Sequence, residues 1–229
     1  KNKTAPLAPA RARIPFPLSF IIFSAKREHG LVPPPLNSES RLIQQPDMLD
    51  SLIINDELCL RQMTEADLPD LAQCLNDPEI ARNTRTIPYP CTLRDAEIFF
   101  EKTKAEYAEL GYFKHWVIGH GERGLIGTVG VFLKEGADGH KDEIGYVLGA
   151  AHRGRGHATA AVRALTAMQF KTRPLLLRME AWVYAYNPAS VRVLEKAGYR
   201  REGYCRSIFW KNDRAVDAWL LARLREDGL

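Results

Sequence analysis

The segment that most constrains this chain is Arg-Gly-Arg-Gly-His-Ala at residues 153–158. Residues 143–148 before it form an apolar, strand-like run, and residues 159–170 after it carry apolar or small side chains at helical spacing. A strand, two closely spaced glycines and a helix N-terminus together bind anions, because glycines allow close approach and the helix N–H groups point outward. The sequence therefore predicts a pyrophosphate-binding loop at residues 153–158.

Two other phosphate-binding motifs do not fit this loop. A dinucleotide-binding fingerprint needs a third glycine where Thr159 stands, and the Gly-Lys-Ser/Thr ending of a mononucleotide P-loop is absent from the sequence. The remaining pattern, Arg-Gly-x-Gly-x-Ala, resembles the loop with which the GCN5-related N-acetyltransferases (GNAT) bind the pyrophosphate of acetyl-coenzyme A (acetyl-CoA). The alternative is a basic turn that binds nothing.

The segments around the loop strengthen this resemblance. Residues 187–199 predict a helix with Asn187 as its N-cap and Gly198 as its left-handed end. They are similar to the family's Asn-x-x-Ser segment, which lines the pantetheine arm of the cofactor. Three further segments resemble the branch that contains the ribosomal-protein N-terminal acetyltransferases: residues 58–67, 76–90 and 202–217. The chain is identified as a member of the GNAT superfamily over about residues 51–226.

Apolar runs and turn residues predict strands and helices in mixed order. The expected strands lie within residues 52–63, around a turn at 55–57, and at 115–120, 125–134, 143–148, 175–183, 199–210 and 215–224. The expected helices lie at residues 64–75, 95–110 and 159–170 and after Asn187. This order predicts an α+β fold with a mixed, mostly antiparallel sheet flanked by helices. The resemblance implies the GNAT fold, in which the fourth and fifth strands splay apart and admit the cofactor.

The chain divides into a basic, proline-rich extension, residues 1–47, and an acetyltransferase domain, residues 48–229. The extension holds eight of the fourteen prolines, and its seven basic residues against three acidic ones account for the whole net charge of +4. A nearly neutral domain argues against nucleic acid as a partner. The apolar run at residues 14–25 is too short to span a membrane. We expect the extension to be disordered or a leader, and the protein to be cytoplasmic, or mitochondrial if residues 1–47 are a leader.

The four cysteines show neither C-x-x-C spacing nor pairing with histidine; they are Cys59, Cys74, Cys91 and Cys205. Such cysteines are typical of free thiols in a reducing compartment. We therefore expect neither a disulfide framework nor a metal site.

Acetyl transfer from a thioester to an amine needs a base, a stabilised carbonyl oxygen and a proton for the leaving thiolate. The candidate base is Glu143, acting directly or through water, because the resemblance implies a catalytic glutamate near the start of the fourth strand. The alternative is a solvated carboxylate at a strand end, and Glu180 is a weaker candidate. For the carbonyl oxygen, the resemblance implies a backbone N–H near Val147 or Leu148, where the family's fourth strand bulges.

The leaving thiolate in many relatives receives its proton from a tyrosine seven residues after the asparagine, where this chain has Leu194. The ribosomal-protein branch is proposed to use a serine three residues after the asparagine, and Ser190 matches it. Ser190 is therefore the candidate acid, with a helix residue that has no partner as the alternative. Asn187 is expected to cap the helix with its oxygen and to bind pantetheine with its amide N–H groups.

The resemblance implies that the loop and its flanks bind the cofactor. The expected cofactor-binding residues are Val147, Leu148, Arg153, Gly154, Arg155, Gly156, His157, Ala158 and Asn187. The chain departs from the family's pattern at Ala151, which replaces a glutamine or arginine, and at His157 and Ala160, which replace an aromatic residue and a glutamate. Arg153 and Arg155 either supply charge to the phosphates or point to solvent. We expect His157 to be a helix-start contact and not a base.

The implied function is that of an N-acetyltransferase, an acyltransferase that uses acetyl-CoA as co-substrate. The acceptor is a primary amine, of a protein N-terminus or a small molecule, and residues 83–91 and 206–214 are expected to select it. Arg82, Arg85 and Arg206 would suit an acidic acceptor. The alternative is a non-catalytic acyl-CoA-binding or scaffold domain of the same fold. We expect a monomer or homodimer, without a metal or a membrane partner.

Overall fold

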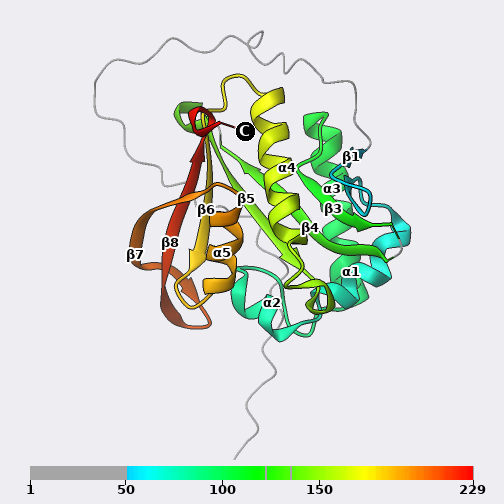
Figure 1. Ribbon diagram of the computed structural model, residues 1–229. Helices are drawn as coiled ribbons and strands as arrows, with labels where there is room; N and C mark the ends of the chain where they lie inside the picture. The colour runs from blue at the N-terminus through cyan, green and yellow to red at the C-terminus, as the bar shows by residue number, and fades with distance from the viewer. Residues whose placement is uncertain (1–50, 122, 135, 229) are drawn as a thin grey trace, which may run out of the picture. The chain divides into compact units, whose positions relative to one another are not determined.

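An eight-stranded sheet organises the residues that the computed structural model describes, which are 51–121, 123–134 and 136–228 (Figure 1). The predicted extension, residues 1–47, lies outside the described residues. In chain order the strands are β1 (Ser51–Ile53), β2 (Leu58–Arg61), β3 (His115–His120), β4 (Gly124–Leu133), β5 (Lys141–Leu148), β6 (Arg178–Tyr184), β7 (Arg200–Lys211) and β8 (Arg214–Leu224). Across the sheet their order is β1-β2-β3-β4-β5-β6-β8-β7. Neighbours run antiparallel, except that β5 and β6 run parallel.

Helices cover both faces of this sheet. Within the described residues the α-helices are α1 (Leu68–Leu75), α2 (Pro78–Asn83), α3 (Leu93–Leu110), α4 (His157–Thr172) and α5 (Pro188–Lys196). The helices α4 and α5 pack into one apolar core, and Figure 1 shows α4 crossing in front of the central strands. The helices α1, α2 and α3 pack into a second core. The predicted α+β architecture, a mixed sheet flanked by helices, is confirmed.

The central strand β3 shows how both faces become buried. Trp116 and Ile118 belong to the core under α4 and α5, whereas Val117 belongs to the core under α1 and α3. Successive side chains of a strand point to opposite faces, so a strand covered on both sides is apolar at nearly every position. This explains why the central strands could be predicted from apolar runs without alternation.

The splay predicted between the fourth and fifth strands of the family lies between β5 and β6. The parallel ladder joins only residues 141–143 to residues 178–180. Beyond this point β5 remains paired with β4 as far as Leu148, and β6 remains paired with β8 as far as Tyr184. The two halves of the sheet therefore part toward one end, as predicted.

Two of the differences from the sequence-based expectation, at α2 and α3, bear on the site. The sequence pattern does not predict α2, because a helix of six residues shows too little periodicity, although Asp77 is its N-cap and Pro78 its first residue. The helix α3 begins at Leu93, two residues before the predicted start, because Thr92 and Asp95 form a capping box. Both helices lie next to the segment that was expected to select the acceptor.

A buried ion pair fixes the closed end of the splay. Asp142 in β5 is 0% exposed and pairs with Arg173, the C-cap of α4. The same carboxylate accepts the backbone N–H of Lys134 at 3.1 Å. Burial raises the pKa of Asp142, and the charge of Arg173 opposes this rise. The pair thus anchors α4 to the strand position that adjoins Glu143.

Replacing Arg173 leaves the carboxylate of Asp142 buried without its charge partner. We expect Arg173→Ala to lower the free energy of unfolding by about 3 kcal/mol, measured by urea denaturation at pH 7. Because the pKa of Asp142 is raised in the folded state, the unfolded chain releases this proton first. The stability of the variant should therefore fall as the pH rises above about 4.

The matched control for this prediction is Arg94→Ala, which removes an exposed ion pair with Glu97 on α3. Exposed pairs contribute little to stability, so this variant should unfold almost like the wild type. Equal losses in the two variants would contradict the role of the buried pair.

Candidate functional site

The splay brings together the two segments that the sequence analysis singled out. Because β5 and β6 run parallel, their C-terminal ends lie at the same end of the sheet. The loop at residues 149–156 follows β5 and leads into α4, and Asn187 follows β6 and begins α5. The predicted pyrophosphate loop and the N-cap asparagine therefore lie at the open end of the splay.

The two glycines of the loop leave room for a ligand. Gly154 and Gly156 have φ angles of +79° and +86°, in the left-handed region that favours glycine. A methyl group on either residue would meet no other atom within 4 Å, so backbone conformation and not crowding requires glycine. The first N–H groups of α4, from His157 onward, have no partner within the helix and carry the positive end of its dipole. The arrangement fits a pyrophosphate.

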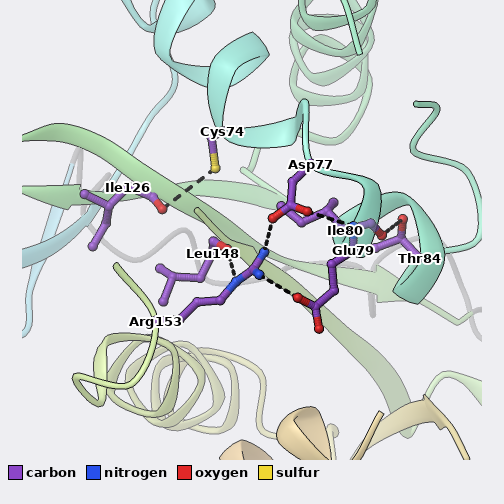
Figure 2. Close-up of polar contacts among 8 residues, drawn as sticks. All are labelled: Cys74, Asp77, Glu79, Ile80, Thr84, Ile126, Leu148 and Arg153. Carbon is purple, nitrogen blue, oxygen red and sulfur yellow. Dashed lines mark hydrogen bonds and ion pairs between the residues drawn. The ribbon is translucent and has the colours of Figure 1, made fainter. Parts of the chain in front are cut away.

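The side chain of Arg153 points to other partners. Its Nε donates to the carbonyl oxygen of Leu148 at 3.1 Å, and its two terminal nitrogens contact Asp77 at 2.7 Å and Glu79 at 3.0 Å (Figure 2). Its backbone N–H donates to Ala150 at 3.3 Å. All three guanidinium nitrogens of Arg153 therefore have partners within the protein, and two of these partners are the carboxylates of Asp77 and Glu79.

Arg155 and His157 line a hollow of about 390 Å³ beside the loop, opposite Glu57, His120 and Arg123. His157 is buried, and its pKa is lowered first by this burial and then by His120 and Arg155. The Nδ1 atom of His157 has no hydrogen-bond partner among the described residues. A neutral, buried ring suits a packing contact at the start of α4.

Glu143, the candidate base, lies where the two strands part. It stands opposite Glu180 in the last rung of the parallel ladder. Its carboxylate lies 3.2 Å from a terminal nitrogen of Arg85 and 3.7 Å from Nζ of Lys134. The alternative of a solvated strand end is wrong, because Glu143 is buried. Glu180 is paired with Arg178 at 2.7 Å.

Of the two residues expected to offer a backbone N–H, Leu148 is the better placed. The backbone N–H of Gly149 donates to Ile126 in β4 at 3.0 Å. Because N–H groups of an antiparallel strand alternate in direction, the N–H of Val147 faces β4 and that of Leu148 faces the opening. The bulge expected near these residues is absent, since the register between β4 and β5 runs unbroken from Asp142 to Leu148.

Asn187 and Ser190 are joined by the helix cap. The side-chain oxygen of Asn187 accepts the backbone N–H of Ser190 at 3.2 Å, which leaves its amide N–H groups outside the cap. The hydroxyl of Ser190 lies 2.7 Å from that of Tyr146 in β5, and the tyrosine hydroxyl also reaches the carbonyl oxygen of Ser190 at 3.1 Å. The alternative of a serine without a partner is therefore wrong.

Tyr146 is a site residue that the sequence analysis does not identify. Burial raises the pKa of its hydroxyl well above the ordinary value, so the hydroxyl stays protonated. No local signal marks this tyrosine, because its partner lies 44 residues further along the chain. It connects β5 to α5 at the open end of the splay.

The two segments expected to select the acceptor lie together in the structure. Nζ of Lys211, in the β7–β8 hairpin, donates to the carbonyl oxygen of Thr84. The guanidinium of Arg82 stacks on Tyr186 at 4.8 Å, and the hydroxyl of Tyr186 donates to the carbonyl oxygen of Arg82 at 2.9 Å. Arg206 is exposed on β7. Aromatic rings and cations thus border the site on this side.

No group of three or more His, Cys, Asp or Glu side chains among the described residues is placed to hold a metal ion. No helix in the same part of the chain is long and apolar enough to cross a membrane. The four cysteines are free, and burial raises the pKa of Cys74 to about 11.

Comparisons with known proteins place the chain among acetyltransferases. The sequence model of the family described as "Acetyltransferase (GNAT) domain" matches residues 57–200. A Bacillus licheniformis protein named "Uncharacterized N-acetyltransferase p20" is 27% identical over 175 residues, which are 76% of this chain and 97% of that protein.

Solved structures share the fold. A GNAT-family acetyltransferase from Bacillus anthracis has a TM-score of 0.64 and 26% identity, over 75% of this chain and 96% of the other. RimL, a ribosomal L7/L12 alpha-N-protein acetyltransferase in complex with coenzyme A, has a TM-score of 0.67 and 20% identity. The match covers 76% of this chain and 97% of the RimL chain. At 20% identity, the second likeness concerns the fold alone.

Asp77 has two roles in this site, and substitutions should separate them. One oxygen caps α2 by accepting the backbone N–H of Glu79 at 2.7 Å, and the other binds Arg153. Asparagine caps a helix as well as aspartate, so Asp77→Asn should lose only the ion pair and at most about 1 kcal/mol of unfolding free energy. Asp77→Ala should lose about 1 kcal/mol more, measured by urea denaturation.

The control is Asp213→Asn, in the β7–β8 turn, where asparagine tolerates the φ of +59°. It should leave the stability unchanged. Equal stabilities of Asp77→Asn and Asp77→Ala would contradict the capping role.

Proposed function

This chain belongs to the GNAT acetyltransferase family, and from that premise we propose that it is an acetyl-CoA-dependent N-acetyltransferase. It transfers the acetyl group to a primary amine by direct attack. One observation carries the proposal: the left-handed glycines follow β5, the pair of Asn187 and Ser190 follows β6, and both lie at the open end of these parallel strands. The name of the Bacillus licheniformis relative and the coenzyme A complex of the RimL neighbour support it.

The cofactor has a complete path in this proposal. The N–H groups at residues 154–158 bind the pyrophosphate, where the open space beside the glycines accommodates it. The pantetheine arm runs into the splay past Asn187, whose amide N–H groups are outside the helix cap. The thioester then lies between the edge of β5 and the first turn of α5.

The reaction requires three groups around the thioester. The amine nitrogen bonds to the carbonyl carbon as the carbon–sulfur bond breaks. The N–H of Leu148 stabilises the carbonyl oxygen, and Ser190 donates a proton to the leaving thiolate. Glu143 accepts the proton of the amine, directly or through water, because each of its oxygens keeps a lone pair beyond its ion pair.

The acceptor is a protein N-terminus or a small-molecule amine, and two features favour a particular class. An α-amine has a pKa near 8, against about 10.4 for lysine, so it is more often neutral and demands less of a base. Arg82, Arg206 and Lys211 border the acceptor side. They favour an amine with a nearby carboxylate over a polycation.

A second candidate function is a non-catalytic acyl-CoA-binding domain. The observation that favours it is Leu194, which stands where many relatives have a proton-donating tyrosine. We also propose a cytoplasmic location, and the Bacillus relatives give no support to the mitochondrial alternative.

Calorimetry of the full chain with acetyl-CoA tests the cofactor. We expect a Kd of about 1–10 μM, the range of ordinary cofactor sites. Gly154→Ala with Gly156→Ala should weaken binding at least about tenfold, because alanine costs about 1–2 kcal/mol per left-handed position and displaces the loop. Gly136→Ala, at a φ of +61° with equally open space in another loop, should bind like the wild type. Equal binding by the loop variant and the control would refute the assigned site.

Turnover assays test the catalytic roles and the second candidate together. The release of free coenzyme A is followed with acidic peptides, neutral peptides and spermidine as acceptors. We expect Glu143→Gln and Ser190→Ala to lower kcat about 100-fold each, with an unchanged Kd for acetyl-CoA. Wild-type binding without release on any acceptor would favour the non-catalytic domain, and undiminished turnover in both variants would show that the catalytic assignments are wrong.

A further inference from the structure

We propose that Arg153 is a positioning residue that couples the cofactor loop to the acceptor side of the site through α2. The proposal rests on the proposed function, because it takes residues 153–158 as the acetyl-CoA loop. It assigns a role to an arginine whose three guanidinium nitrogens all contact acceptors of the protein itself. The coupling has three parts: the attachment to the loop, the attachment to α2, and the contacts at the far end of α2.

The attachment to the loop is rigid. Arg153 directly precedes Gly154, and its backbone N–H is already bonded to Ala150. Its Nε is bonded to the carbonyl oxygen of Leu148, the last residue of β5. The backbone of Arg153 is therefore bonded to the turn that follows β5, and its Nε is bonded to the end of the strand itself.

The attachment to α2 uses the remaining nitrogens of the guanidinium. They bind Asp77 and Glu79, and Asp77 simultaneously caps the helix through its second oxygen (Figure 2). A planar guanidinium presents donors in a fixed fork, so it holds three acceptors in one geometry, which a lysine cannot do. We call Arg153, Asp77 and Glu79 the arginine clamp.

The far end of α2 carries the acceptor side. Just past this end, Arg85 contacts the candidate base Glu143. Tyr186 donates to the carbonyl oxygen of Arg82, and Lys211 donates to that of Thr84. A helix of six residues is about 9 Å long and moves as one piece. The arginine clamp at one end therefore constrains the acceptor contacts at the other.

The carboxylates of Asp77 and Glu79 explain why a cationic side chain is needed at position 153. Two carboxylates beside an anion-binding loop would oppose the phosphates of the cofactor, and Arg153 neutralises them at 2.7 and 3.0 Å. When bound cofactor holds the loop in place, Arg153 is held in place with it. Local opening of α2 must then break the ion pairs of Asp77 and Glu79 with an arginine that cannot follow the helix. The open population of α2 then falls, which transmits cofactor binding to the acceptor side.

Hydrogen exchange of the full chain, with and without coenzyme A, tests the coupling. Coenzyme A should slow the exchange of amides 80–84 at least about fivefold in the wild type. In Asp77→Asn with Glu79→Gln, which keeps the cap and removes both charges, the slowing should be less than about twofold. The control is Glu97→Gln with Glu101→Gln, which loses two exposed ion pairs of α3 and should behave like the wild type.

Calorimetry on the same samples distinguishes a failure of the coupling from a failure of the proposed function. The clamp variant should still bind coenzyme A within about threefold of the wild type and keep protection of residues 154–158. Undiminished protection of α2 in that variant, or a protected loop without a protected α2 in the wild type, would overturn the coupling. A wild type that does not bind coenzyme A would overturn the proposed function and the coupling with it.

A single substitution guards against a double variant that does not fold. Glu79→Gln keeps Asp77 and the helix cap, and it removes one of the two ion pairs. It should show a slowing between those of the wild type and the double variant. Slowing equal to that of the wild type would overturn the proposal.

Discussion

The site of this protein depends on a sheet that is paired on both sides of a gap but not across it. The strand β5 is held by β4, and β6 is held by β8, to the ends of both strands. Their mutual ladder stops after three residues, where Asp142 and Arg173 anchor α4. Backbone groups along the gap must find other partners, since a buried N–H or C=O is costly when unpaired. The carbonyl oxygen of Leu148 accepts from Nε of Arg153, and its N–H faces the opening, beyond the end of the β5–β6 ladder.

The parts of the site that could be predicted from the sequence are those fixed by neighbouring residues. Asn187 is the N-cap of α5, and Gly198 has a φ of +93°, because a helix end needs a particular residue at a particular place. The left-handed glycines of the loop follow the same logic. The splay could be expected only through the family resemblance, because no local pattern states where two parallel strands stop pairing. The α2 cap was equally local, but six residues carried too little periodicity to be identified.

The parts that could not be predicted depend on partners far apart in the sequence. Arg153 meets a carboxylate 76 residues away, and Tyr146 meets a serine 44 residues away. From the sequence, an arginine beside glycines is a charge available to a phosphate. Only the fold shows that this arginine forms ion pairs with Asp77 and Glu79. The expectation of a bulge near Val147 was wrong for a related reason. Family resemblance carries the order of elements, but the local register of two strands follows from the side chains that pack around them.

Under the proposed function, the same long-range contact explains how the chain can lack a tyrosine at position 194. Leu194 is 1% exposed within the core, and a hydroxyl there would have to be buried among apolar side chains. One turn earlier, Ser190 meets a tyrosine hydroxyl that comes from β5 instead of α5. That hydroxyl stays protonated, and its single proton can go either to the carbonyl oxygen or to the hydroxyl oxygen of Ser190. In the second arrangement the serine proton is left for the thiolate. As the serine gives up its proton, the same donor stabilises the charge that forms on its oxygen. In the proposed reaction Ser190 is then an acid supported by Tyr146, and the two hydroxyls come from opposite sides of the opening between β5 and β6.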